Sequence, residues 1–175
     1  MNEEKVILVN KNDVQLGLMS KMEAHRKGIL HRAFSIFIFN SSNMLLMQKR
    51  SSLKYHSPGL WTNTCCSHQR DGENTPNAAK RRLLEEMGLN VEVNEIFSFI
   101  YKANLKNNLI EHEFDHVLIG FTDKNPTVNI TEVEDWNWAD LSFLEGDIGI
   151  NPNLYTEWFK IIFKKVKNYV ESSYK

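Results

Sequence analysis

Cysteine is scarce in this chain, and its two copies, Cys65 and Cys66, are neighbours. Adjacent cysteines form a disulfide with each other only under strain, and no third cysteine is present with which either could pair. We therefore expect free thiols and a reducing compartment.

An excess of charge of one sign is also lacking. The formal net charge of −1 gives no broad field that would attract a polyanion, which argues against nucleic acid as a partner. No apolar run approaches the roughly 18 residues of a membrane span. The first residues, MNEEKVILVN, begin with acids and lack the basic-then-apolar order of a signal peptide. We expect a cytoplasmic protein that binds neither membrane nor nucleic acid.

Proline, linkers and repeats are sparse, whereas core-forming residues are plentiful. The chain has four prolines, 42% hydrophobic residues and 11% aromatic residues, which is enough to bury a core and argues against disorder. Its 175 residues are within the usual size of one hydrophobic core. We predict one domain over residues 1–175.

The first half of the chain carries signals for a hairpin and a helix. The segments RAFSIFIF (32–39) and MLLMQKR (44–50) flank the turn sequence NSSN, which predicts two paired strands. Farther on, Thr75 as a cap, Pro76 in the first turn and Gly88 at the end predict a helix.

The second half is mainly strand-like and then helical. Residues 89–104, 109–122 and 133–140 alternate with polar turns and are expected to form strands. Residues 155–173 have helical spacing, and one face of that helix is predicted to pack in the core through Trp158, Ile162, Val166 and Tyr169. Strands around a central helix, with a closing helix, predict an α/β fold of the α+β kind with a mixed sheet covered on both faces.

Carboxylates gather in the segment EHEFDH. Strand alternation would place Glu111, Glu113 and Asp115 on one face of a strand, with His112 and its alternate neighbours on the other. Carboxylates on one face repel each other. A bound cation, a shared proton that raises one pKa, or exposure to solvent would each relieve that repulsion. The segment alone does not choose among the three.

Three histidines, His25, His31 and His68, stand near breaks or strand starts. Side chains from different segments can converge there, as a metal site requires. A single histidine is more often a hydrogen-bonded residue of the core or surface, so each of them alone has that simpler interpretation.

The adjacent cysteines do not fit structural zinc, whose cysteines are usually two or more residues apart. Either Cys65 or Cys66 could be a catalytic thiol or a small buried side chain. Cations outside the apolar patterns could bind phosphate or simply be solvated; these are Lys21, Arg50 and Lys54.

The predicted central helix carries a signature pattern. The spacing GX5EX7REUXEEXGU is matched at six positions: Glu73, Arg81, Glu85, Glu86, Gly88 and Leu89. Ser67 stands in place of its first glycine, and Arg82 in place of the glutamate that follows the arginine. Such a helix face holds divalent cations that in turn hold a diphosphate. These two departures weaken the alternative interpretation, a Nudix hydrolase acting on a nucleoside diphosphate derivative.

Together with LHRAFS, PGLWTNTCCSH, AAKRRLLEEMG and EHEFDHV, this pattern makes the chain resemble the type I isopentenyl-diphosphate delta-isomerase family from about Lys21 to Trp158. The resemblance implies a Nudix-like α/β/α sandwich with a mixed sheet. It also implies a reversible 1,3-allylic shift between isopentenyl and dimethylallyl diphosphate. A non-catalytic metal-binding protein is a further alternative, against which the catalytic-type residues named next argue.

The resemblance also implies roles for individual residues. Cys66 and Glu113 would be the acid–base pair on opposite faces of the substrate, Tyr101 would assist Glu113, and Trp158 would face the carbocation. We favour Glu113 as the group that protonates the alkene and Cys66 as the base; the sequence leaves the opposite direction open, because the reaction is reversible and each group must exchange roles. The substrate diphosphate would be bound by Lys21, Arg50, Lys54 and Arg82. One divalent ion, Mn²⁺, Zn²⁺ or Mg²⁺, would be held by His25, His31, His68, Glu111 and Glu113. A Mg²⁺ on the diphosphate would be held by Glu86 and the backbone of Cys66. The implied partner is a small isoprenoid diphosphate, and the oligomeric state is open.

Overall fold

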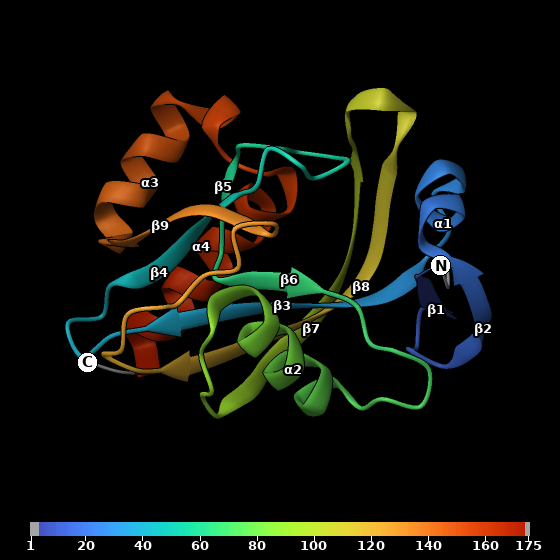
Figure 1. Ribbon diagram of the computed structural model, residues 1–175, viewed down its shortest axis with the longest axis horizontal. Helices are drawn as coiled ribbons and strands as arrows, with labels where there is room; N and C mark the ends of the chain where they lie inside the picture. The colour runs from blue at the N-terminus through green and yellow to red at the C-terminus, as the bar shows by residue number, and fades with distance from the viewer. Residues whose placement is uncertain (1–3, 174–175) are drawn as a thin grey trace.

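The computed structural model describes residues 4–173, in which nine strands form one mixed sheet (Figure 1). The strands are β1 (Lys5–Val9), β2 (Gln15–Ser20), β3 (His31–Phe39), β4 (Leu45–Arg50), β5 (Trp61–Thr62), β6 (Cys65–Ser67), β7 (Val93–Asn104), β8 (Ile110–Phe121) and β9 (Val133–Ala139). The helices are α1 (Lys21–Lys27), α2 (Thr75–Met87), α3 (Leu141–Ile150) and α4 (Glu157–Ser173), with short 3₁₀ turns η1 (Lys106–Asn108) and η2 (Pro152–Leu154).

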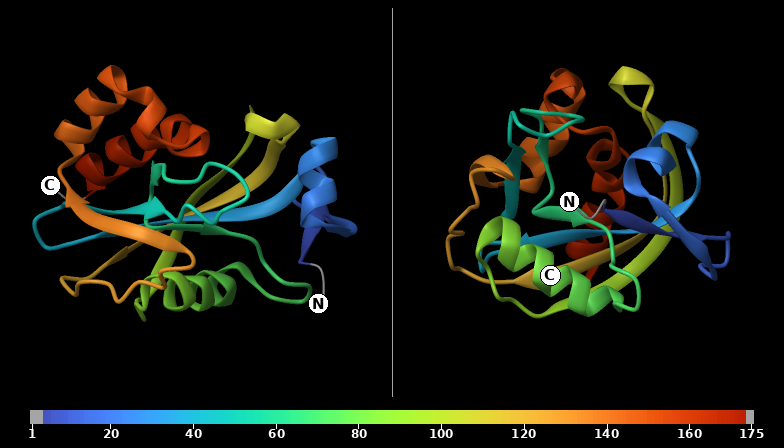
Figure 2. Two further views of the ribbon diagram at one scale, coloured as in Figure 1. Left: turned by 45° about the horizontal axis from the view of Figure 1, so that its top comes forward. Right: turned by 45° about the vertical axis from the view of Figure 1, so that its right-hand side comes forward.

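Strand β3 is the centre of the sheet. It pairs in parallel with β8 and antiparallel with β6 and β1. Almost every residue of β3 is buried, because helices cover both faces of the sheet: α2 lies on one face, and α3 and α4 lie on the other (Figure 2). The expected mixed sheet with two covered faces is therefore confirmed.

Each face of the sheet has its own apolar cluster. Phe34, Ile36 and Cys65 pack towards α2, which contributes Leu83 and Met87. The opposite cluster contains the buried side of α4, namely Trp158, Phe159, Ile162, Phe163, Val166 and Val170. Tyr169, predicted on that face, is only partly buried and packs at its margin.

The predicted hairpin forms only at its turn. Strands β3 and β4 pair at Phe39 and Leu45 and then diverge. Strand β4 takes β9 as its main partner, over Leu45–Arg50, and β3 takes β8 over its whole length. Sequence neighbours joined by a short turn therefore open a gap that β6 enters beside β3.

The central helix is found where it was predicted, but the predicted cap is wrong. Asn74 is the N-cap, and its side chain accepts a hydrogen bond from the backbone of Asn77. Thr75 is the first helical residue, and its hydroxyl accepts from the Gln69 amide at 3.1 Å. Asparagine is at least as good an N-cap as threonine, so the adjacent residues Asn74 and Thr75 were both possible N-caps. Gly88 ends the helix in the left-handed conformation with φ of 66°.

Several elements were not predicted: the strands β1, β2, β5 and β6, the helices α1 and α3, and the turns η1 and η2. Among the helices of residues 4–173, none combines the length and apolar character needed to cross a membrane.

Candidate active site

Strand register builds one side of the site. Glu113 on β8 lies directly opposite His31 on β3 and Tyr101 on β7. Directly paired residues point to the same face of a sheet, so these three side chains form one row across three strands. The alternation predicted for β8 is confirmed, because Glu111, Glu113 and Asp115 are all buried on this face.

Two further histidines complete a cluster around Glu113. His25 comes from α1 and His68 from the segment after β6. With His31 and Glu113 they offer four ligand atoms that all lie within 4.8 Å of one another. The structure therefore brings together four of the five predicted ligands. The fifth, Glu111, lies beside this cluster, with Oε1 3.7 Å from Nε2 of His56.

The cluster has the properties that a divalent metal requires. Nε2 of His25 and Nε2 of His31 are buried and have no hydrogen-bond partner within residues 4–173, and Nε2 of His68 lies 3.0 Å from Oε1 of Glu113. Unpaired buried polar atoms are costly, and a metal ion would satisfy them. Three imidazole nitrogens and one carboxylate oxygen suit Zn²⁺ or Mn²⁺ in ligand type. The residues present fit a bound ion.

Burial keeps the imidazoles of His25 and His68 neutral. It lowers the pKa of His25 to about 3, aided by the neighbouring His68 and His31. Burial also lowers the pKa of His68 to about 4, against the opposing effect of the Glu113 carboxylate. A neutral imidazole offers a lone pair, so these two side chains stay able to bind metal well below neutral pH.

The two glutamates share a tyrosine and differ in protonation. The Tyr101 hydroxyl lies 2.5 Å from Oε2 of Glu113 and 3.1 Å from Oε2 of Glu111. Burial and the adjacent Glu113 carboxylate raise the pKa of Glu111 well above its usual value. Burial would also raise the pKa of Glu113, but the contacts of His31 and His68 outweigh it and hold that pKa well below its usual value. Without metal, the proton of this pair lies on Glu111.

The adjacent cysteines point to opposite faces of β6, as alternation along a strand requires. Cys65 is fully buried in the cluster beneath α2. Cys66 lies opposite Ser35 of β3 and faces the same side as the glutamates. Both are free thiols, as expected. Burial, and next the carboxylate of Asp115, raise the pKa of Cys66, so its sulfur carries a proton at neutral pH.

The Cys66 sulfur is held by Trp158, which the resemblance placed in the site, and by Asn63, which the sequence did not identify. Asn63 Nδ2 donates to the carbonyls of Ile36 and Cys65, which leaves Oδ1 to accept from the Cys66 thiol at 2.9 Å. Trp158 Nε1 donates to the same sulfur at 3.1 Å. Asn63 follows no recognisable motif, and its role depends on a fold that places β3 and β6 side by side.

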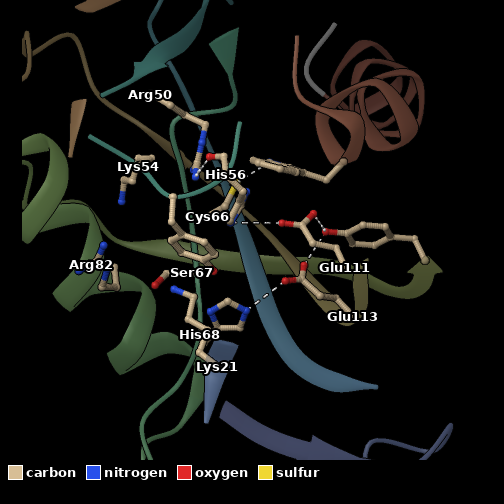
Figure 3. A pocket seen from close by; sticks show the side chains of 13 residues that line it. Lys21, Arg50, Lys54, His56, Cys66, Ser67, His68, Arg82, Glu111 and Glu113 are labelled. Carbon is tan, nitrogen blue, oxygen red and sulfur yellow. Dashed lines mark hydrogen bonds and ion pairs between the residues drawn. The ribbon is translucent and has the colours of Figure 1, made fainter. Parts of the chain in front are cut away.

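A pocket joins the glutamates, the thiol and the cations. Its walls include all four predicted diphosphate-binding residues, and Figure 3 shows Arg50, Lys54 and Arg82 on the side opposite Glu111 and Glu113. The lining residues are Lys21, Arg50, Lys54, Tyr55, His56, Cys66, Ser67, His68, Arg82, Tyr101, Glu111, Glu113 and Trp158. His25 and His31 lie behind this wall, fully or almost fully buried. Tyr55 and His56 were not predicted, and no spacing rule marks them.

The acidic residues of the signature pattern, in α2 and just before it, pair with arginine side chains. Glu73 receives two hydrogen bonds from Arg81, at 2.8 and 2.7 Å. Arg82 contacts Glu86 and donates to Glu85 at 2.8 Å. Glu86 is buried and also accepts from Gln48 at 3.1 Å. Arg82 thus places a cation at the position where the signature has a further glutamate.

Comparison with known proteins defines the class. Residues 29–159 match the family described as NUDIX domain. A protein named DR0079 from Deinococcus radiodurans has the same fold with a TM-score of 0.76 at 19% identity, covering 92% of this chain and 98% of its own. A MutT protein from Methanosarcina mazei gives 0.65 at 16% identity, with 79% of this chain and 94% of its own covered. The Nudix-like fold that the sequence predicted is confirmed.

Curated relatives narrow the class. Isopentenyl-diphosphate Delta-isomerase 1 of Aromatoleum aromaticum is 52% identical over 164 residues, which are 94% of this chain and 93% of the relative. Isopentenyl-diphosphate Delta-isomerase 2 of Photorhabdus laumondii is 52% identical over 160 residues, covering 91% and 90%. The chain belongs to the isopentenyl-diphosphate Delta-isomerase family, within the Nudix fold.

Proposed function

We propose that Cys66 and Glu113 are the acid–base pair with which this isomerase interconverts isopentenyl and dimethylallyl diphosphate. The observation that carries the proposal is that both side chains line one buried pocket together with four cations. The reaction adds a proton to the terminal alkene carbon and removes one from the carbon two positions away. It therefore needs two proton-carrying groups around one bound diphosphate.

Glu113 is the group that protonates the alkene in this proposal. Tyr101 holds one Glu113 oxygen at 2.5 Å and also lies 3.1 Å from Oε2 of Glu111. Its hydroxyl can pass a proton to Glu113, because a hydroxyl group accepts one proton while it donates another.

Cys66 is the base that removes the second proton. A forward turnover begins with a Cys66 thiolate and a proton on Glu113, and it ends with a Cys66 thiol and a Glu113 carboxylate, which are the resting forms of the two groups. Before the next forward turnover, the thiol gives its proton to an exchangeable group and Glu113 takes one up; the reverse reaction starts from the resting forms directly. Trp158 lies against the same pocket, and its indole ring supplies the negative π-face that steadies a tertiary carbocation. The buried walls keep water from capturing that cation.

The diphosphate is bound by the cations of the pocket, Lys21, Arg50, Lys54 and Arg82. Arg50 is fixed by the carbonyls of His56 and Ser57 and lies 5.2 Å from the Trp158 ring centre. The adjoining cleft is lined by Lys21, Lys54 and Arg82 as well, with Arg70 and Arg81 beyond them. The diphosphate therefore lies towards solvent, and the hydrocarbon end lies inward between Cys66 and Glu113.

Divalent metal dependence is typical of the family, and two places in this chain would hold ions. His25, His31, His68, Glu111 and Glu113 would hold one Mn²⁺, Zn²⁺ or Mg²⁺; the four clustered side chains form its base, and Glu111 is the neighbouring fifth. Glu86 and the Cys66 backbone would hold a Mg²⁺ on the diphosphate. Bound metal supplies positive charge that orders Glu113 and neutralises phosphate.

Hydrolysis is disfavoured by the arrangement of α2. A hydrolase of this fold needs several free carboxylates for metal, whereas here Glu73 and Glu85 are paired with Arg81 and Arg82. Glu86 is buried and contacts Arg82 and Gln48. Arg82, which stands where the signature has a glutamate, thus removes one acid from this helix and pairs with two others, which argues against the hydrolase alternative.

The proposed chemistry is tested by running the reaction in heavy water. We expect deuterium in the new methyl group of dimethylallyl diphosphate, and in the other exchangeable allylic position after long incubation, because protons come from exchangeable groups. No phosphate should be released. Mass and proton spectra measure the label. Unlabelled product would contradict the acid–base mechanism, and released phosphate would favour the hydrolase alternative.

Removing metal should abolish turnover. After exhaustive chelation we expect activity to fall by on the order of 10²-fold or more, because no ion then orders Glu113 or neutralises the diphosphate. Elemental analysis should find one tight ion per chain, which His31→Ala loses. His116→Ala is the matched control, since His116 lies on the other face of β8 and contacts Asp13 and Glu95. Normal turnover by metal-free protein would refute the cluster's role.

A further inference from the structure

Tyr55 lies in the irregular segment between β4 and β5, residues 51–60, which we call the strap. Three consecutive strap residues, Lys54, Tyr55 and His56, line the pocket. The Tyr55 hydroxyl lies 2.8 Å from Nδ1 of His25, and the two rings are stacked with an interplanar angle of 24°. The strap therefore reaches the histidine cluster through one hydroxyl group.

That hydrogen bond sets the orientation of His25. Because Nδ1 of His25 is taken by Tyr55, the atom left to bind an ion is Nε2, which is buried and has no hydrogen-bond partner among residues 4–173. For Nε2 to present a lone pair, the ring proton must be on Nδ1 and must be donated to the Tyr55 oxygen. His31 is oriented differently, because its Nδ1 donates to the nearby carbonyl of Ile29 at 2.8 Å. Of these two rings, only His25 takes its orientation from the strap.

The same strap contacts the cations proposed to bind diphosphate. Arg50 donates to the strap carbonyls of His56 and Ser57, at 3.1 and 3.2 Å. Lys21 Nζ lies 5.9 Å from the centre of the Tyr55 ring. Lys54 is itself a strap residue and contacts Glu132, which lines the cleft that adjoins the pocket. Three of the four cations are therefore positioned on or against the strap.

We propose that Tyr55 couples metal binding at the histidine cluster to diphosphate binding at Lys21, Arg50 and Lys54. This inference rests on the proposed function. An ion on Nε2 of His25 fixes the ring, the ring fixes the Tyr55 hydroxyl, and the hydroxyl fixes the strap that carries or contacts the three cations. By linkage, each ligand must then strengthen the binding of the other by the same factor.

Simple electrostatic attraction also couples the two ligands, because a bound divalent cation favours a nearby diphosphate. The contribution of Tyr55 can be separated from it. Tyr55→Phe keeps the ring, its stacking on His25 and all charges, and removes only the hydroxyl. Whatever coupling remains in this variant is electrostatic, and whatever is lost passes through the strap.

The experiment measures two affinities in wild type and Tyr55→Phe. Affinity for Mn²⁺ is measured by competition with a chelator in the absence of substrate. Affinity for isopentenyl diphosphate is measured by calorimetry on metal-free protein and on fully loaded protein, so that weaker metal binding does not distort the second comparison. Tyr155→Phe is the matched control, because that hydroxyl donates to Asp147, outside the pocket.

We expect Tyr55→Phe to bind Mn²⁺ about tenfold more weakly, as loss of a hydrogen-bond partner behind a ligand does. The ratio of diphosphate affinities between loaded and metal-free protein should shrink about fivefold or more relative to wild type. Tyr155→Phe should change neither quantity. An unchanged ratio in Tyr55→Phe overturns the coupling even if Mn²⁺ binding weakens, and leaves the proposed function intact. A wild-type cluster that binds no Mn²⁺ refutes the metal site itself, and the coupling with it.

Discussion

Replacing Cys66 with alanine is expected to reduce turnover by on the order of 10³-fold or more, whereas Cys65→Ala should keep most of the activity. The two side chains are adjacent in the chain but point to opposite faces of β6. Cys66 faces the pocket, where Asn63 and Trp158 hold its sulfur. Cys65 is fully buried beneath α2. Steady-state kinetics with isopentenyl diphosphate compares the two variants.

The pair of variants controls for loss of a sulfur atom as such. Each removes one sulfur, so a difference in turnover reports position rather than composition. Cys65→Ala leaves a small void in the core and should cost about 1 kcal/mol of unfolding free energy, measurable by denaturant titration. Cys66→Ala should still bind substrate, because the cations that hold the diphosphate are unchanged. Equal losses of turnover in the two variants would contradict the assignment of Cys66.

Local signals were strong enough to predict some elements of this fold. The central helix was identified because Pro76 and Gly88 punctuate it, and β8 because its carboxylates recur at every second residue in a segment bounded by polar turns. Strand β2 escaped prediction because it is an edge strand whose Leu16 and Leu18 side chains are exposed, at 66% and 39%, so no buried face imposes alternation. Helix α1 has only seven residues, too few to reveal a helical period.

The site was predictable where one element carries it and not where several meet. Period-two spacing placed Glu111 and Glu113 on the same face of β8 without knowledge of the fold. Tyr101 and His31 flank Glu113 only because of the register of three strands, which the family resemblance implied and local patterns could not. Asn63 and Tyr55 have no motif at all. Their contacts depend on the gap between β3 and β4 and on the path of the strap.

Replacing Glu113 with glutamine should affect both halves of the proposed site. The amide cannot carry or transfer a proton, so turnover should fall by on the order of 10³-fold or more. It also removes the only carboxylate among the four clustered ligand groups, so elemental analysis should show less bound metal. Glu95→Gln is the matched control: it makes the same chemical change on the adjacent strand β7, where Glu95 contacts His116 on the opposite side of the sheet.

The two measurements on Glu113→Gln separate its roles. If excess Mn²⁺ restores full metal occupancy but not turnover, Glu113 transfers the proton itself, because the site is then filled and only the acid is missing. Deuterium exchange into the substrate in heavy water should remain absent in that filled variant. If occupancy and turnover return together, Glu113 serves only to hold the ion, and another group of the pocket supplies the proton. Full activity with glutamine at this position and no added metal would reject both roles.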